Sequence, residues 1–324
     1  MFVSRRLLKN IGRYSALSSL LLVSLTVAHA QSSRTLSALA YIERGNQRLD
    51  KGEWERAIAD YDLAIATDPR APQAYNNRGI ARKAKGDLEG ALADFNRAIE
   101  LDPRHLYAYY NRGLLRDARK EYDEAIADFS QALEIDPRSA PAFGNRANAR
   151  YAKGDFGGAL ADCDRALALN RRSQLAYNTR GLVRQKQRDL DGAIADFNQA
   201  IAIDPKYAQC YFNRGNAYFD KCEAERALAD YTRAIALKPN FAEAYTNRGT
   251  IYATLGRLDR ALADYDQAIQ LQPTSAANYL NRGLVKLLQG RAAEAQEDFA
   301  QCIALDQKLK PRIEQAKQLL AGNP

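Results

Sequence analysis

The sequence predicts an all-α fold, a solenoid in which antiparallel helix pairs stack one on the next. The main observation is a 34-residue period that keeps its phase from residue 38 to residue 309. Each period holds two stretches with apolar residues at helical spacing, separated by a turn residue. One helix pair cannot bury its apolar face alone, so units repeating in phase must stack. The triplet that marks the period, Asn-Arg-Gly, ends at Gly79, Gly113, Gly181, Gly215, Gly249 and Gly283, and Glu43-Arg44-Gly45 and Asn145-Arg146-Ala147 take the two remaining places.

The first element, residues 1–30, has the order of a secretory signal peptide. Basic residues at positions 5, 6, 9 and 13 precede an apolar run over 16–27, and Ala28-His29-Ala30 follows. The alternative is an uncleaved membrane anchor, for which the run is short. We therefore expect an exported protein, in a bacterial periplasm, with no membrane span after cleavage. Without this segment the net charge falls from +8 to +4, which weakens the case for a nucleic-acid partner.

After a short linker over 31–37, eight units of equal length are expected. Unit 72–105 shows their design, with Tyr75 and Gly79 on a first helix and Ala91 and Phe95 on a second. Gly79 should let the two helices approach closely at Ala91. The turn between the helices carries Gly52, Gly86, Gly154, Gly256 and Gly290, and Lys120, Arg188 and Cys222 in the other units. The eight units are 38–71, 72–105, 106–139, 140–173, 174–207, 208–241, 242–275 and 276–309.

The last element, 310–324, is expected to form a helix that caps the open end of the solenoid. Ile313, Ala316, Leu319 and Leu320 lie on one side of it. Leu280, Leu284, Leu287 and Leu288 are either an apolar floor of a binding groove or the place where this helix docks.

These units resemble the tetratricopeptide repeat, whose pattern has an aromatic, a glycine or alanine four residues on, then Ala, aromatic, Ala and Pro at fixed offsets. The resemblance implies a right-handed superhelix with the first helices lining a concave groove. It also implies a non-enzymatic scaffold that binds proteins or peptides there.

Two charged rows depart from the usual family pattern. Every unit has an arginine before its glycine, or before Ala147 in unit 140–173, and an aspartate sixteen residues after that arginine. A half-buried guanidinium needs a carboxylate, so we expect the rows to pair as a structural ladder. The alternative is an exposed arginine row that binds an anionic ligand. The arginines are Arg44, Arg78, Arg112, Arg146, Arg180, Arg214, Arg248 and Arg282, and the aspartates are Asp60, Asp94, Asp128, Asp162, Asp196, Asp230, Asp264 and Asp298.

An asparagine row on the first helices is the candidate binding site. An amide both donates and accepts hydrogen bonds, so such a row can hold the backbone of an extended peptide whatever its sequence. The row is similar to the asparagine ladder of O-GlcNAc transferase, whose catalytic domain has no counterpart here. The alternative is that these amides bridge adjacent repeats. The row comprises Asn77, Asn111, Asn145, Asn213, Asn247 and Asn281.

Aromatic residues on the same faces could anchor a partner. Tyr107, Tyr110 and Tyr151 are expected to form a central patch, and Phe212 and Phe219 a second one. Packing against a neighbouring repeat is the alternative for each of them.

The composition gives no support to catalysis. The chain has two His, one Met and four Cys, and one of the two histidines lies in the predicted signal peptide. We expect no enzyme, no cofactor and no metal. Cys163 and Cys302 should be buried, Cys210 and Cys222 lie too far apart on one helix to bridge, and His105 is expected at the surface.

The sequence thus favours an exported scaffold that binds a protein or extended peptide in the cell envelope. The alternative is a self-associating structural component of an envelope complex. The partner's identity is left open.

Overall fold

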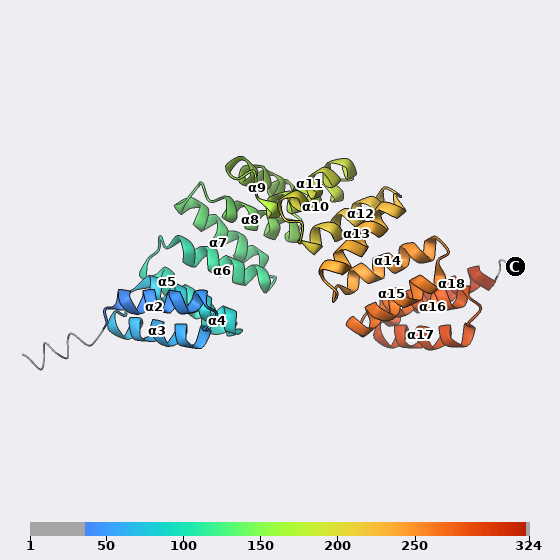
Figure 1. The fold of residues 1–324 in the computed structure, drawn as a ribbon, viewed down its shortest axis with the longest axis horizontal. Helices are drawn as coiled ribbons and strands as arrows, with labels where there is room; N and C mark the ends of the chain where they lie inside the picture. The colour runs from blue at the N-terminus through green and yellow to red at the C-terminus, as the bar shows by residue number, and fades with distance from the viewer. Residues whose placement is uncertain (1–35, 322–324) are drawn as a thin grey trace, which may run out of the picture. The chain divides into compact units, whose positions relative to one another are not determined.

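The computed structural model describes residues 36–321. Within that range, seventeen α-helices and one short 3-10 helix (η1, Gln307–Leu309) form, and no strand. The all-α solenoid of helix pairs is therefore confirmed (Figure 1). The predicted signal peptide, 1–30, lies outside the described residues, and none of the described helices is long and apolar enough to cross a membrane.

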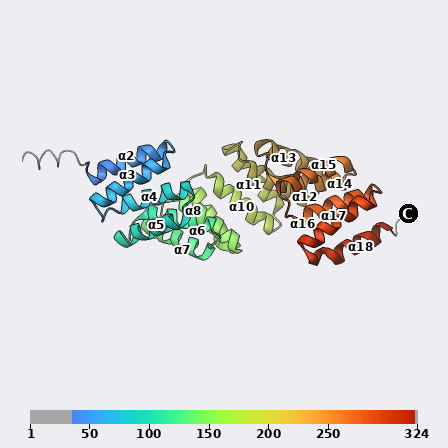
Figure 2. The same ribbon diagram turned by 90° about the horizontal axis from the view of Figure 1, so that it is seen from below.

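The chain divides into two compact units, one up to Pro137 and one from Arg138 onward. Within each, consecutive helices pack as pairs and each pair contacts the next (Figures 1 and 2). The first unit holds α2 (Ala38–Asp50), α3 (Trp54–Thr67), α4 (Pro72–Lys85), α5 (Leu88–Leu101), α6 (Leu106–Ala118) and α7 (Tyr122–Ile135). The second holds α8 (Ala140–Lys153), α9 (Phe156–Leu169), α10 (Gln174–Lys186), α11 (Leu190–Ile203), α12 (Ala208–Asp220), α13 (Ala224–Leu237), α14 (Ala242–Thr254), α15 (Leu258–Leu271), α16 (Ala276–Leu288), α17 (Ala292–Leu305) and α18 (Lys310–Ala321).

Local sequence sets where these helices begin and end. Pro72 occupies the first turn of α4, where a missing N–H costs no hydrogen bond. Gly86 ends α4 at a φ of 93°, and Asp87 then caps α5 by accepting from the Gly90 N–H at 2.9 Å. The predicted turns all have positive φ. Three of them hold residues with side chains in this glycine-favouring region, namely Lys120, Arg188 and Cys222 at 63°, 67° and 61°.

In seven of the eight repeats, the core of the helix pair is an aromatic ring lying on a glycine. A Cβ atom built on Gly79 would be 2.6 Å from Cε1 of Phe95, which leaves no room for a methyl group. The ring, and not the expected Ala91, is the closest neighbour of this glycine. In unit 140–173 both residues differ. Ala147 replaces the glycine, and the smaller Cys163 replaces the ring, so the added methyl group is matched by a smaller side chain opposite.

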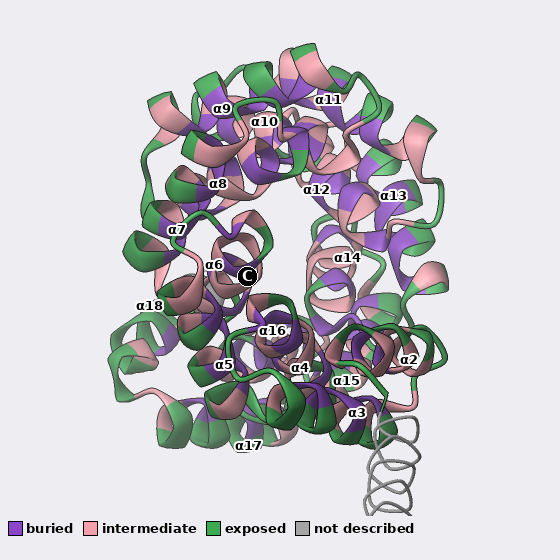
Figure 3. Ribbon diagram, turned by 90° about the vertical axis from the view of Figure 1, so that its left-hand side faces the viewer, coloured by how far each residue is buried: buried purple, intermediate pink, exposed green. Residues whose placement is uncertain are grey.

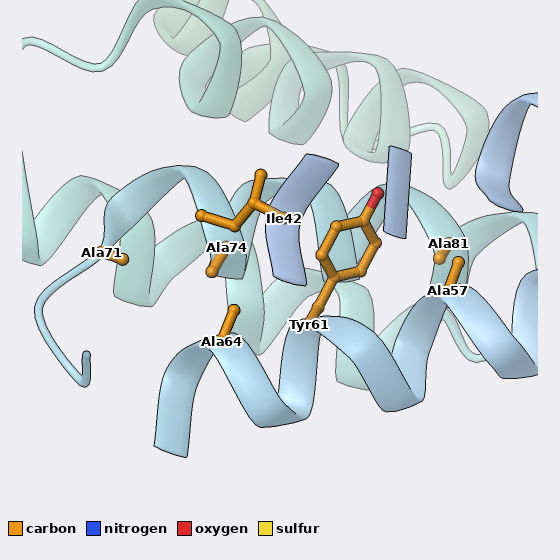
Figure 4. Packing of buried hydrophobic residues seen from close by; sticks show 7 residues of the cluster. All are labelled: Ile42, Ala57, Tyr61, Ala64, Ala71, Ala74 and Ala81. Atoms are coloured by element: carbon orange, nitrogen blue, oxygen red, sulfur yellow. The ribbon is translucent and has the colours of Figure 1, made fainter. Parts of the chain in front are cut away.

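Buried residues also join one repeat to the next (Figures 3 and 4). Ile42, Tyr61, Ala64 and Ala71 of the first repeat form one cluster with Ala74 at the start of the second. At the other end, Ile313 of α18 is fully buried in a cluster with Leu280, Phe299 and Cys302, and Leu284, Leu287 and Leu309 pack against it. The C-terminal leucines are thus a docking place for the last helix, except for Leu288, which is exposed.

The four cysteines are free thiols; Cys163 and Cys302 are buried as expected, and Cys210 is buried too. Burial raises the pKa of the Cys163 thiol to about 12. The expectation for His105 was wrong, since this side chain is buried. Its Nδ1 caps α6 by accepting from the Ala108 N–H at 3.1 Å, and burial lowers the pKa of the ring.

Candidate functional site

The two charged rows pair within each repeat, as the ladder hypothesis predicted. In every unit the arginine donates from Nε and Nη2 to the two oxygens of a nearly buried aspartate. Arg180, for example, meets Asp196 at 3.0 and 2.8 Å, and this hydrogen bond raises the pKa of the Arg180 guanidinium. The Nη2 to Oδ1 distances for the eight pairs run from 2.5 to 2.8 Å.

Further contacts hold each guanidinium in place. It lies over the aromatic ring three residues earlier on its own helix, with 5.5 Å from Arg180 Cζ to the Tyr177 centroid. Nη1 of Arg180 reaches back to Asp164 of the preceding repeat at 2.7 Å. Six of the buried aspartates accept from a second cation as well, such as Arg184 on Asp196 at 2.9 Å. Each arginine of the row is therefore paired with a buried aspartate of its own repeat, so the row is not an unpaired anion site.

The asparagine row bridges neighbouring first helices. Asn111 donates to Asn76 at 3.0 Å, Asn76 to Asn77 at 2.9 Å, and Asn77 to Asn46 at 2.8 Å. Tyr61 Oη donates to the same Asn46 oxygen at 2.8 Å, so one amide network links α2, α4 and α6.

The same bridging occurs in the compact part of the chain that begins at Arg138. Asn213 donates to Asn178, and Asn247 donates to Asn216, each at 2.9 Å. Asn145 donates to the Pro141 carbonyl at 2.9 Å, and Asn281 is half-buried on α16. Each bridge uses one of the two amide hydrogens, so peptide binding by these side chains stays a prediction.

The structure separates the predicted aromatic residues into packed and exposed members. Tyr110 lies 5.9 Å from Phe129 between ring centroids, whereas Tyr107 is 65% exposed. Phe212 packs on Phe241 at 4.7 Å, whereas Phe219 is 44% exposed. The two aromatic patches therefore stay predictions.

Tyr151 contacts Phe156, with 5.9 Å between centroids, and also borders a pocket. This pocket, of about 450 Å³, lies on the first helices of three successive repeats, α8, α10 and α12. Gln185 donates to Asp220 across it at 2.7 Å. Lys186 and Arg188 add positive charge, and Leu182 adds an apolar wall. Its lining residues are Tyr151, Leu182, Gln185, Lys186, Arg188, Asn216 and Asp220.

The repeat pattern also matches known families. Tetratricopeptide repeat models match residues 49–105, 106–139, 208–241, 242–275 and 276–309, and a TPR repeat model matches 186–221. This chain is a tetratricopeptide repeat protein. No curated protein sequence matches it.

Solved structures share the fold. A tetratricopeptide repeat protein from Parabacteroides merdae ATCC 43184 is 22% identical, with a TM-score of 0.60 over 80% of this chain and 98% of that chain. The APC/C hetero-tetramer Cut9–Hcn1 is 18% identical, with a TM-score of 0.65 over 83% of this chain and 52% of that chain. Both likenesses establish the fold.

Sequence reasoning missed most of the pocket. Leu182, Gln185, Lys186 and Asp220 vary from one tetratricopeptide repeat to the next, so the period gives them no signal. Their positions on the first helices, shared with the predicted site residue Tyr151, were the available clue.

Proposed function

We propose that this protein is an exported, non-enzymatic scaffold that binds a protein or extended peptide along the faces of its first helices. The observation that carries the proposal is the pocket on α8, α10 and α12, which combines an aromatic, an apolar and several polar side chains. Such a mixture suits a peptide, because apolar anchors supply affinity and polar groups hold the backbone.

Two further features support the same face. First helices of successive repeats contact each other directly, as α8 does α10, so a partner can cross from repeat to repeat. The amide of Asn216 on α12 lines the pocket and adds a further polar group to it. Export rests on the order of charges and apolar residues in 1–30.

Site-specific photocrosslinking in the living cell tests the binding face. A photoreactive residue replaces Lys186 in the pocket or, as the control, Gln199 on the exposed side of α11. We expect a crosslinked partner at position 186 only, with the crosslink mapping by mass spectrometry to one extended segment. Equal capture at both positions would refute the pocket. Concentration-dependent sedimentation of the purified protein, with no partner captured, would favour the self-assembly alternative.

Export has its own test. N-terminal sequencing of the envelope form should find cleavage after Ala30, and a full-length protein in the membrane fraction would favour the anchor instead.

A further inference from the structure

In several repeats the first helix holds the preceding second helix by two polar contacts. Arg78 on α4 donates from Nη1 to Asp62 on α3 at 2.6 Å, and Lys85 meets Glu55 at 3.3 Å. In the next repeat, Arg112 donates to Asn96 at 2.7 Å, and Arg119 pairs with Glu89 at 2.8 Å. Two donors seven residues apart thus meet two acceptors seven residues apart.

The first helix of the array, α2, carries the same two donors without a preceding repeat. Arg44 and Lys51 stand at the positions of Arg78 and Lys85. Arg44 bonds Asp60 through Nε and Nη2, but within residues 36–321 its Nη1 has no acceptor. Its side chain is 40% exposed, against 15–19% for the seven later arginines.

An apolar side chain lies beside these donors. Leu39 is 71% exposed on α2. Its counterpart on α10, Leu175, packs on the preceding first helix, since Cδ2 lies 3.5 Å from a Cβ built on Gly144. Gln47 replaces the buried apolar residue of later repeats, such as Ala81, and is exposed. The face of α2 that carries Arg44 and Gln47 is therefore compatible with solvent when nothing covers it, and it offers mainly polar contacts to a partner.

We propose that this face of α2 binds an amphipathic helix of another protein that presents two carboxylates seven residues apart. Residues 1–35 hold no Asp or Glu, so they lack the matching charge. The far end of a second copy lacks it too, because α17 carries Ala293 and Ala300 at the two acceptor positions. That end is also covered by Ile313 of α18. Charge complementarity thus selects a different, acidic partner.

The chain itself supplies the probe. A stapled peptide of residues 258–271 copies α15, which carries Asp259 and Asp266 seven residues apart, and the staple offsets the poor stability of short helices in water. Fluorescence anisotropy measures its binding to the full chain. The double variant Leu39→Asp/Lys51→Glu leaves the Arg44–Asp60 pair intact. The matched control, Leu255→Asp/Lys206→Glu, makes the same changes at exposed residues elsewhere.

We expect the α2 variant to weaken peptide binding at least tenfold, and the control to leave it unchanged. Replacing Asp259 and Asp266 of the peptide by alanine should have the effect of the α2 variant. Binding should also weaken from 50 to 300 mM salt, since exposed ion pairs are screened. Absence of binding, or equal binding to both variants, overturns the proposal. A dimer of the unmixed chain that Lys51→Glu abolishes would also overturn it, because the occupant would then be a second copy.

Discussion

The buried aspartates show how single residues stabilise each repeat. Asp196 is almost fully buried and accepts from Arg180 and Arg184 at once. Two cations and one anion give the cluster a positive charge, and Asp164 on the preceding repeat balances it from outside. Removing the inner carboxylate therefore leaves two partly buried guanidinium groups, Arg180 with only the exposed Asp164 and Arg184 with only the exposed Asp189.

Asp196→Ala should lower the free energy of unfolding by about 3 kcal/mol, because breaking a buried ion pair strands the other charge. Asp164→Ala is the control: this carboxylate is 63% exposed, so its loss should cost less than about 1 kcal/mol. Urea denaturation measures both. Equal losses would show that burial does not decide the value of these pairs.

The ring on glycine gives a second prediction for single residues. A Cβ on Gly181 would lie 2.7 Å from Cε1 of Phe197, so Gly181→Ala should destabilise the protein by about 1–3 kcal/mol. Phe197→Cys alone should cost about 3 kcal/mol through the cavity that it leaves.

The double variant reproduces the Ala147–Cys163 combination of unit 140–173. It should be no less stable than Phe197→Cys alone, since the added methyl then enters the vacated space. Additive losses in urea denaturation would contradict this explanation of the exception.

Among the elements, the turns between helices differ in strain. Arg188 has a φ of 67°, a region that costs a side-chain-bearing residue roughly 1–2 kcal/mol. Arg188→Gly should therefore raise the free energy of unfolding by about 1 kcal/mol. Gln187→Gly, one residue earlier at a φ of −82°, should raise nothing and serves as the control in the same urea titration. A lower stability of Arg188→Gly would mean that its side chain contributes more than the strain costs.

The last helix acts as the cover of the array. Ile313 is fully buried against the eighth repeat, so Ile313→Asp should detach α18 and cost about 3 kcal/mol or more. A dye that binds exposed apolar surface should then bind more strongly, because Leu280 and Leu284 become accessible. Arg312→Asp, at an exposed position of the same helix, should change neither stability nor dye binding.

Much of this architecture could be predicted from the sequence, because every 34-residue repeat carries the same residue types at the positions that set its helices, turns and pairs. Helices, turns and Arg–Asp pairs recur in every unit, so each copy tests the others. The exceptions depend on contacts that no period encodes. His105 is buried and caps α6, and the Asn111 and Asn213 amides bond to amides of the preceding first helix. The pocket is lined by residues of three helices, α8, α10 and α12, so the sequence of any one helix does not predict it.

In the molecule as a whole, the two ends of the array differ in protection. The C-terminal end is covered by α18, while α2 has an exposed arginine and leucine. Hydrogen exchange should therefore be faster in α2 and α3 than in α16 and α17, since unfolding of a stack begins at its least supported repeat. Equal protection at both ends would show that α18 adds nothing to the stability of its neighbours.

The arginine contacts also govern how the length of such a protein can change. Where Nη1 of an arginine has an acceptor on the preceding repeat, that acceptor stands at a fixed register, as Asn198 does for Arg214 and Thr232 for Arg248. Removing residues 208–241 would bring Arg248 to the register of Asn198, an acceptor of the same kind. Whole repeats are therefore exchangeable parts, so that gene duplication or loss in steps of 34 codons can lengthen or shorten the protein without designing a new interface.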